Sequence, residues 1–193
     1  MIIKSEGSLI KDSVVLGEVF LDRYACITRS SLLGYNAIGC FSYVRNSILG
    51  RYTHIGSRVS VGGAKHPLDW VSIGSFQYRN DCWKSKSSII PFDEGDGVNI
   101  GSDVWIADNS VVLGNVSLGV GSVIGAGSVV VKDVPPYMIV CGNPAREMRM
   151  RFDQIHVDHL LKTQWWNKSP KELEGLTMND PSQFIYDFNS KFN

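Results

Sequence analysis

The chain has 193 residues, of which 44% are hydrophobic and 20% are charged, as is usual for a globular domain. Its 19 basic residues balance its 19 acidic residues, and a neutral chain is a poor candidate for a nucleic-acid-binding protein. The sequence contains no apolar run long enough to span a membrane, and its first residues lack the apolar segment of a signal peptide. We therefore expect a cytoplasmic protein with reduced cysteines that bind no metal, namely Cys26, Cys40, Cys82 and Cys141.

The N-terminal part of the chain repeats with a period of six residues. From Val14, an apolar residue returns at Phe20, Cys26, Leu32, Ile38 and Val44. The register then loses one residue and resumes at three aliphatic residues that precede glycines, Leu49, Ile55 and Val61. A period of six fits neither a helix nor a plain strand, but it suits a short strand and a tight turn in alternation. Three such units would form one triangular coil of roughly 18 residues, which predicts N-terminal β-helix coils over residues 1–62.

The repeat stops over residues 63–97, a segment much longer than the usual connection within a compact domain. Long loops are usually functional, and an aromatic-rich excursion from a rigid scaffold can form the wall of a pocket. The segment contains one histidine and several aromatic residues, namely His66, Trp70, Phe76, Tyr78 and Trp83. Its acidic run is interpreted as a solvated turn, with contact to an acceptor as the alternative; this run is Asp93, Glu94 and Asp96. We predict an active-site loop here.

The period returns after the loop and is more regular there. Counting in sixes finds six aliphatic residues, Ile100, Ile106, Val112, Leu118, Ile124 and Val130. Four of them precede glycine or alanine, whose small side chains let the backbone bend at a corner. The repeat ends at Pro135 and Pro136, because proline cannot donate to a β-ladder. About fifteen hexads, or about five coils, predict an all-β solenoid whose C-terminal coils cover residues 98–150.

The remaining residues, 151–193, have the pattern of helices. An apolar stripe at helical spacing is formed by Phe152, Ile155, Leu160 and Leu161. Ser169 with Glu172 three residues later predicts a capping box, and Pro181 predicts the start of a last helix that ends near Lys191. We expect these helices to pack on the exposed end of the solenoid, where an uncovered strand edge would pair with other chains.

Several segments together resemble the xenobiotic acetyltransferases, a group of hexapeptide-repeat acyltransferases. The resemblance lies in the hexads, the loop sequence HPLDWVS, the stretches IGSDVWIA and VVVKDVPPYMIVCGNPAREMRMRF, and the segment FDQIHVDHLLKTQWW. It covers nearly the whole chain, and the group includes type B chloramphenicol acetyltransferases, streptogramin acetyltransferases and related polysaccharide O-acetyltransferases. The resemblance implies a left-handed parallel β-helix, acetyl-CoA as co-substrate, and a homotrimer with active sites between subunits. The period alone leaves a right-handed β-helix or another solenoid open.

The loop departs in one place from the antibiotic-modifying members of that group. Those members typically have a Pro-Phe pair where this chain has residues 72–78, SIGSFQY. This departure favours the members that acetylate sugars of capsule or lipopolysaccharide. We therefore predict an acetyl-CoA-dependent O-acetyltransferase that modifies a sugar hydroxyl in a surface polysaccharide or its precursor. The alternatives are an antibiotic O-acetyltransferase and an amino-sugar N-acetyltransferase, although the latter usually has a nucleotide-binding domain before its repeats.

His66 matches the catalytic histidine that the resemblance implies, and it is our candidate general base; the alternative is a packing histidine beside a proline turn. A neutral hydroxyl is a poor nucleophile toward a thioester, and histidine can remove its proton near neutral pH. Asp69 either orients His66 or contacts the acceptor, or it fixes the turn after Pro67. Trp70 and Tyr78 are further candidates for orienting His66 or binding the acceptor. The backbone N–H groups of residues 62–64 are candidate donors to the oxyanion of the tetrahedral intermediate.

Six positions match the coenzyme A site that the resemblance implies, namely Trp105, Ala107, Ala126, Lys132, Arg146 and Arg149. In that family the pantetheine arm lies in a groove between two subunits. Lys132, Arg146 and Arg149 would meet the phosphates of the cofactor through charge-assisted hydrogen bonds. Ala107 stands where the family usually has glycine. The alternative for Arg149 is that, with Arg151, it only solvates the start of a helix.

The other histidines have simpler interpretations. His54 lies within a hexad and is read as a solvated or interface residue of its coil. His156 and His159 have no third metal ligand near them in the sequence, so we read them as a polar helix face and expect no metal. A β-helix carbonic anhydrase would need three zinc histidines, which the spacing does not offer. A non-catalytic scaffold or ice-binding solenoid is the last alternative, and the intact His66 loop and the few, unaligned threonines argue against it.

Overall fold

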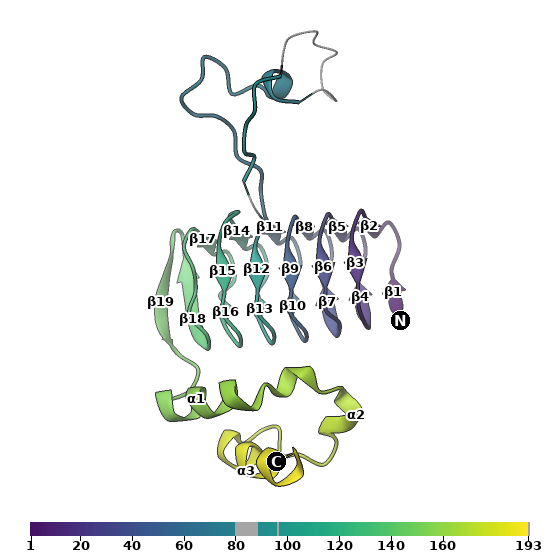
Figure 1. The fold of residues 1–193 in the computed structure, drawn as a ribbon, viewed down its shortest axis with the longest axis vertical. Coiled ribbons are helices and arrows are strands. Elements are labelled where there is room, and N and C mark those ends of the chain that lie inside the picture. Colours follow the sequence, from purple (N-terminus) through teal and green to yellow (C-terminus); the bar gives the residue numbers. More distant parts are fainter. Residues whose placement is uncertain (80–88, 96, 193) are drawn as a thin grey trace.

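The computed structural model describes residues 1–79, 89–95 and 97–192. The chain forms a parallel β-solenoid whose short strands stack into sheets of eight, six and five strands, here sheets A, B and C. Three helices lie along one side of the solenoid, and a long loop projects from the opposite side (Figure 1). In the part of the chain that the structure describes, no helix is long and apolar enough to cross a membrane.

The strands are short because each occupies one side of a triangular coil. Sheet A contains, in spatial order, β1 (Ile2–Lys4), β4 (Val19–Leu21), β7 (Asn36–Ile38), β10 (His54–Ile55), β13 (Trp105–Ile106), β16 (Val123–Ile124), β18 (Met138–Gly142) and β19 (Ala145–Met150). Sheet B contains β2 (Leu9–Lys11), β5 (Cys26–Thr28), β8 (Tyr43–Arg45), β11 (Ser60–Val61), β14 (Val111–Val112) and β17 (Val129–Val130). Sheet C contains β3 (Val14–Val15), β6 (Ser31–Leu32), β9 (Ile48–Leu49), β12 (Asn99–Ile100) and β15 (Ser117–Leu118).

The length of a coil changes along the solenoid. In the N-terminal half, Ile2 pairs with Val19 and Val19 pairs with Asn36, a step of 17 residues. In the C-terminal half, Val111 pairs with Val129, a step of 18 residues. An N-terminal coil is therefore two six-residue units and one five-residue unit, so the hexad register slips by one residue in every coil.

This slip makes part of the predicted N-terminal register wrong. The inward-facing residues of the first strands are Leu21 and Ile27, both 0% exposed, whereas the predicted Phe20 is 42% exposed and Val14 is 54% exposed. Cys26 likewise lies one position off, next to the buried Ile27. The prediction placed a single five-residue unit, between Val44 and Leu49, but each 17-residue N-terminal coil contains one.

The C-terminal hexads are confirmed as the core of the solenoid. All six predicted aliphatic residues are at most 2% exposed, namely Ile100, Ile106, Val112, Leu118, Ile124 and Val130. They stack in register from coil to coil, as Ile55, Ile106 and Ile124 do in sheet A. Each aliphatic side chain is therefore buried by its equivalents in the neighbouring coils, which is how a solenoid stabilises a chain of very short strands.

The sheet continues past the prolines at which the hexad repeat ends. Val134 forms a bridge with Leu118, and β18 then pairs with β16 in parallel. β19 turns back and pairs with β18 in the antiparallel direction. Pro135 and Pro136 occupy the corner between two sides of the coil, where no ladder hydrogen bond is required of them.

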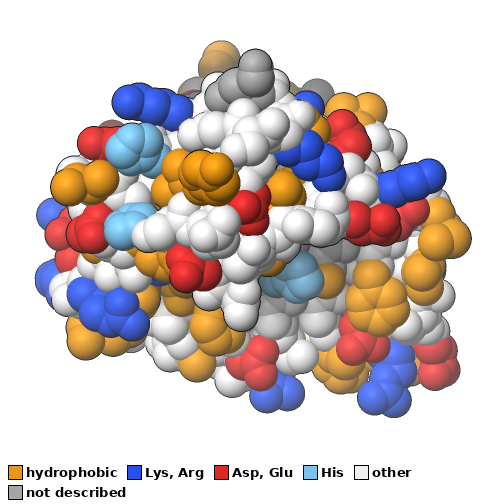
Figure 2. Space-filling view, turned by 90° about the horizontal axis from the view of Figure 1, so that it is seen from below, with side chains coloured by type: hydrophobic (Ala, Val, Ile, Leu, Met, Phe, Trp, Pro, Cys, Tyr) orange, Lys and Arg blue, Asp and Glu red, His pale blue; other side chains and the backbone are white. Residues whose placement is uncertain are grey.

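The C-terminal segment forms α1 (Gln154–Thr163), α2 (Pro170–Leu173) and α3 (Pro181–Phe192). The predicted capping box is confirmed: Ser169 Oγ accepts from Glu172 N, and the Glu172 carboxylate accepts from Ser169 N. The last helix begins at Pro181 as predicted. Seen from the helical side, the surface mixes apolar, acidic and basic side chains (Figure 2), which is typical of a solvated surface.

The helices pack along a lateral corner of the solenoid, not on its end as we expected. Tyr52 Oη donates to Lys168 O at 2.6 Å, and Arg151 Nη1 donates to Gly121 O at 2.7 Å and forms an ion pair with Asp103 at 3.0 Å. These partners lie on corners of successive coils, so the helices run across several coils. The apolar faces of α1 and α3 bury Tyr137, which projects from the same row of corners.

Tyr137 predicts a loss of stability in alkali. Its side chain is 1% exposed, and burial raises the pKa of Tyr137 from 10.0 to about 12. Because the fold disfavours the ionised phenol, the stabilisation that requires the neutral form is complete below pH 10 and is lost as the pH rises through about 12. It amounts to about 3 kcal/mol. Urea denaturation of Tyr137→Phe should show less loss of stability between pH 10 and 12 than that of the wild type. Tyr186→Phe, at an exposed site, is the control, and parallel losses in all three proteins would contradict the prediction.

Candidate active site

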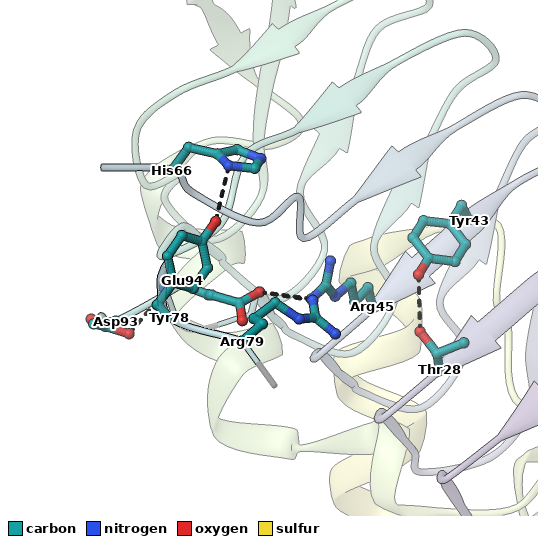
Figure 3. A network of polar contacts seen from close by, with 9 residues as sticks. Thr28, Tyr43, Arg45, His66, Tyr78, Arg79, Asp93 and Glu94 are labelled. Atoms are coloured by element: carbon teal, nitrogen blue, oxygen red, sulfur yellow. Dashed lines mark hydrogen bonds and ion pairs between the residues drawn. The ribbon is translucent and has the colours of Figure 1, made fainter. Parts of the chain in front are cut away.

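The projecting loop is anchored at its base by backbone pairing and by one ion-pair cluster. Lys65 N donates to Glu94 O at 2.8 Å, which joins the two ends of the loop. The Glu94 carboxylate lies 3.4 Å from Arg45 Nη2 and 3.5 Å from Arg79 Nη1 (Figure 3). Arg45 belongs to β8, so this cluster ties the loop to the solenoid. These side chains are half-buried, and a partly buried pair resists salt screening better than an exposed one.

His66 is held by contacts to one of its two ring nitrogens. Its Nδ1 lies 2.9 Å from Ile73 O. The same nitrogen lies 3.0 Å from Tyr78 Oη (Figure 3). A carbonyl oxygen can only accept a hydrogen bond, so Nδ1 must carry the proton for the Ile73 contact to be favourable. The neutral ring then has its lone pair on Nε2. An exposed side chain with this tautomer can accept a proton at Nε2.

An aromatic cluster forms the core of the loop. The Tyr78 ring lies 5.0 Å from the Phe92 ring and 6.1 Å from the Trp70 ring, measured between centroids. The Trp70 and Phe92 rings are 5.5 Å apart in an edge-to-face arrangement, which aromatic pairs prefer. Of the predicted loop residues, Trp83 and Asp96 lie outside the described residues, as does Cys82.

The structure bears on two further predictions about the loop, the choice of oxyanion donor and the role of Asp69. Gly62 N donates to Val112 O at 3.0 Å, so this N–H belongs to the solenoid ladder and is not available to an oxyanion. The remaining candidates are the N–H groups of Gly63 and Ala64. Asp69 is exposed, and within the described part of the chain the hydrogen-bond partners of His66 are Ile73 and Tyr78 rather than Asp69.

The predicted cofactor residues fall into two groups. Lys132 and Arg146 line one cavity of about 500 Å³ beyond the last coil, between β17 and the β18–β19 hairpin. On the outer face of sheet A, the register aligns Trp105 with Val123, then Ile139, then Arg149. Trp105 is 54% exposed in this row.

The two alanines lie at corners of the coil. Ala107 is 6% exposed and directly follows β13, whereas Ala126 is exposed. Gly125, beside Ala126, leaves room for Cys141, because a Cβ at this glycine would lie 2.8 Å from Cys141 Cβ. The space beside this glycine is therefore occupied by the next strand of the solenoid, β18.

These groups do not meet within one chain. His66 lies on the projecting loop, while Lys132, Arg146 and Arg149 lie on the final coil and hairpin (Figure 1). The other histidines lie outside the loop. His54 is exposed on β10, and His156 on α1 lies 2.8 Å from Asp153 Oδ1 and 2.8 Å from Ser182 Oγ. Within the described residues, no three His, Cys, Asp or Glu side chains gather as a metal site.

Two groups that organise the loop were not predicted from the sequence: the Ile73 carbonyl, which contacts His66, and the Glu94 carboxylate, which ties the loop to the solenoid. The Ile73 carbonyl belongs to the backbone, so no side-chain pattern indicates its role. Glu94 was interpreted as part of a solvated turn, yet it pairs with Arg45, 49 residues away. An acidic residue that pairs in space with arginines 49 and 15 positions away leaves no signature in the order of residues.

A parallel solenoid with a histidine on a projecting loop, and with basic residues at its last coil, has the architecture of a solenoid acyltransferase. A chloramphenicol acetyltransferase of Klebsiella aerogenes is 32% identical over 179 residues, which cover 88% of this chain and 85% of that protein. A probable macrolide acetyltransferase of Lysinibacillus sphaericus is 38% identical over 131 residues, 65% of this chain and 72% of that protein. This identity over most of the chain shows that it belongs to the family of hexapeptide-repeat acetyltransferases that includes the chloramphenicol acetyltransferases.

The fold itself is shared with more distant enzymes. AntD, an N-acyltransferase from Bacillus cereus solved in complex with dTDP and 3-hydroxybutyryl-CoA, superimposes with a TM-score of 0.62 at 19% identity. The match covers 86% of this chain and 89% of that one. No protein-family model matches the chain.

Proposed function

We propose that this acetyltransferase moves an acetyl group from acetyl-CoA to a sugar hydroxyl in a surface polysaccharide or its precursor, with His66 as general base. The observation that carries the proposal is the pair of contacts to His66 Nδ1, which leaves the Nε2 lone pair available to a bound hydroxyl. Acetyl-CoA is a cytoplasmic metabolite, so we place the reaction in the cytoplasm.

The reaction balances through one proton on His66. Nε2 removes the proton of the acceptor hydroxyl as its oxygen bonds to the thioester carbonyl carbon. The resulting oxyanion accepts a hydrogen bond from a backbone N–H, for which Gly63 and Ala64 are the candidates. When the intermediate collapses, the carbon–sulfur bond breaks, the proton on Nε2 passes to the coenzyme A thiolate, and the acetyl ester remains on the acceptor.

We propose that the complete site forms between subunits of a homotrimer. Two observations support this arrangement. His66 and the cofactor residues lie on different parts of one chain, and the loop carries apolar side chains without cover, with Leu68 92% exposed and Val71 fully exposed. Exposed apolar side chains that gather on one loop are typical of an interface. Sedimentation of a stable monomer would count against this arrangement.

The cofactor assignment predicts a selective loss of affinity for acetyl-CoA. Replacing Lys132 and Arg146 together by alanine should raise the KM for acetyl-CoA at least about 10-fold, because charge-assisted bonds to phosphates are lost. The value of kcat should change little, since these residues would bind substrate and transition state alike. Steady-state kinetics with acetyl-CoA as the varied substrate measures both. The double variant Lys11→Ala, Arg23→Ala removes the same charge from the N-terminal coils and should leave KM unchanged. An unchanged KM in Lys132→Ala, Arg146→Ala would refute the placement.

The saccharide acceptor rests on the loop sequence. Residues 72–78 replace the Pro-Phe pair of the antibiotic-modifying members, and Ile73 and Tyr78 of this stretch are the two partners of His66. The sequence of the acceptor side of the site therefore differs from that of the antibiotic-modifying members. An antibiotic hydroxyl is the second candidate, because the relatives at 30–33% identity over 172 or more residues are chloramphenicol acetyltransferases.

The acceptor is tested by release of coenzyme A. Purified protein and acetyl-CoA would be incubated with a divided panel, and free thiol measured. One half contains chloramphenicol, a macrolide and a streptogramin A; the other contains hexoses, amino sugars and oligosaccharides of bacterial surface glycans. Turnover confined to saccharides supports the proposal, with the site of acetylation read by NMR as an ester or an amide. Rapid turnover of an antibiotic would overturn it.

A further inference from the structure

Tyr78, the second hydrogen-bond partner of His66, takes no direct part in the proposed proton transfer. Tyr78 Oη lies 3.0 Å from His66 Nδ1, on the side of the ring opposite to Nε2. It cannot reach the reacting hydroxyl through that contact. From this geometry we infer that Tyr78 is a positioning residue: the Ile73 carbonyl sets the tautomer of His66, and the Tyr78 hydroxyl accepts from the same Nδ1–H and orients the ring. The inference rests on the proposed role of His66 and deepens it.

The backbone and the ring of Tyr78 are both held by neighbouring residues. The residue ends the 3-10 turn Ser75–Gln77, with Tyr78 N donating to Ser75 O at 3.1 Å. Its ring packs between Trp70 and Phe92, and Ile90 N donates to Gln77 O at 2.8 Å, which joins the two arms of the loop. A hydroxyl on a ring held in this way loses little further conformational entropy when it binds His66.

The next residue connects this turn to the solenoid. Arg79 forms the ion pair with Glu94, and Glu94 pairs in turn with Arg45 on β8. The Tyr78 hydroxyl is therefore positioned by the rigid coils as well as by the loop. Catalytic geometry held by packed neighbours of this kind is what a general base requires, because a small misplacement of the base is costly to the rate.

The charges explain why two acceptors are useful at one nitrogen. The Ile73 carbonyl, which can only accept, keeps the proton on Nδ1, and this single Nδ1–H can be shared with Tyr78 Oη, which then also accepts. When Nε2 takes the proton of the acceptor, the ring becomes cationic and the Nδ1–H bonds become charge-assisted, so they strengthen. An interaction that strengthens on the way to the transition state raises kcat rather than substrate affinity.

Tyr78→Phe tests the inference, because it removes the hydroxyl and keeps the ring between Trp70 and Phe92. The value of kcat should fall about 3- to 10-fold, the usual worth of one hydrogen bond, while the KM for acetyl-CoA stays constant. A second measurement does not depend on activity. In protein labelled with 15N-histidine, the ring-nitrogen shifts of neutral His66 should report the Nδ1–H tautomer in both proteins, with the Nδ1 shift changed in Tyr78→Phe because one of its two acceptors is lost.

The controls separate this inference from the proposed function. Tyr186→Phe changes an exposed tyrosine on α3 and should match the wild type in rate and spectrum. His66→Ala assigns the His66 signals and tests the general base independently. Wild-type kcat and an unchanged Nδ1 shift in Tyr78→Phe would overturn the inference while leaving His66 as base. Full activity in His66→Ala would overturn the proposed function itself, while the Nδ1 shift in Tyr78→Phe would still decide whether Tyr78 contacts and positions the ring.

Discussion

Replacing His66 by alanine is expected to lower kcat at least about 100-fold, the usual contribution of a general base. The Ile73 contact at Nδ1 leaves the lone pair of this exposed ring on Nε2. Without it, the acceptor hydroxyl would have to attack with its proton in place. The KM for acetyl-CoA should be unaffected, because the residues proposed to bind the cofactor, such as Lys132 and Arg146, lie on other elements. Initial rates of coenzyme A release with saturating acetyl-CoA and acceptor measure the effect.

The control for this variant is His159→Ala. His159 is an exposed histidine on α1 whose Nδ1 lies 2.8 Å from Ile155 O, so it too has one ring nitrogen beside a backbone carbonyl. Its loss should leave kcat unchanged, which separates the removal of a general base from the removal of any histidine. If His66→Ala keeps wild-type kcat while its denaturation midpoint is unchanged, His66 is not the base.

The repeats illustrate how far a period can be read from sequence. From β12 to β17 the step between paired strands is 18 residues, a multiple of six, so counting in sixes from Ile100 keeps its register and finds the buried aliphatic residue of each strand. In the N-terminal coils the step is 17, and each coil shortens one turn by a residue. The outward residues there are also apolar, among them Val14 and Phe20, so the composition of the two faces did not reveal the error.

The site shows the same division between local and distant information. The break in the repeat predicted the loop, and the resemblance to the xenobiotic acetyltransferases singled out His66 within it. The orientation of His66 depends on a backbone carbonyl and on a tyrosine twelve residues along, which meet only when the loop folds. The helix starts at Ser169 and Pro181 were predicted because capping is local, whereas the docking of the helices was not, since it depends on which corner of the coils presents Tyr52 and Tyr137.

The core of the middle coils carries the second large prediction. Ile106 is 0% exposed and stacks between Ile55 and Ile124 in sheet A, so its side chain is surrounded by those of both neighbouring coils. Ile106→Ala should lower the free energy of unfolding by about 2–5 kcal/mol, from lost burial and from the cavity left behind. Urea denaturation followed by circular dichroism measures the change. The matched control is Ile48→Ala, at an outward position of β9 that is 50% exposed, and it should cost less than about 1 kcal/mol.

The position of Ile106 determines what else this variant should do. A solenoid is stabilised by contacts between neighbouring coils, so a weak coil in the middle reduces the coupling between the two halves. The loop with His66 leaves the solenoid after β11 and returns before β12, directly beside this coil, and Lys132 and Arg146 lie on the far side of it. Loss of activity on warming should therefore accompany the first unfolding step of Ile106→Ala. An Ile106→Ala protein with the same urea midpoint as Ile48→Ala would mean that the stack of aliphatic side chains is not what holds the coils together.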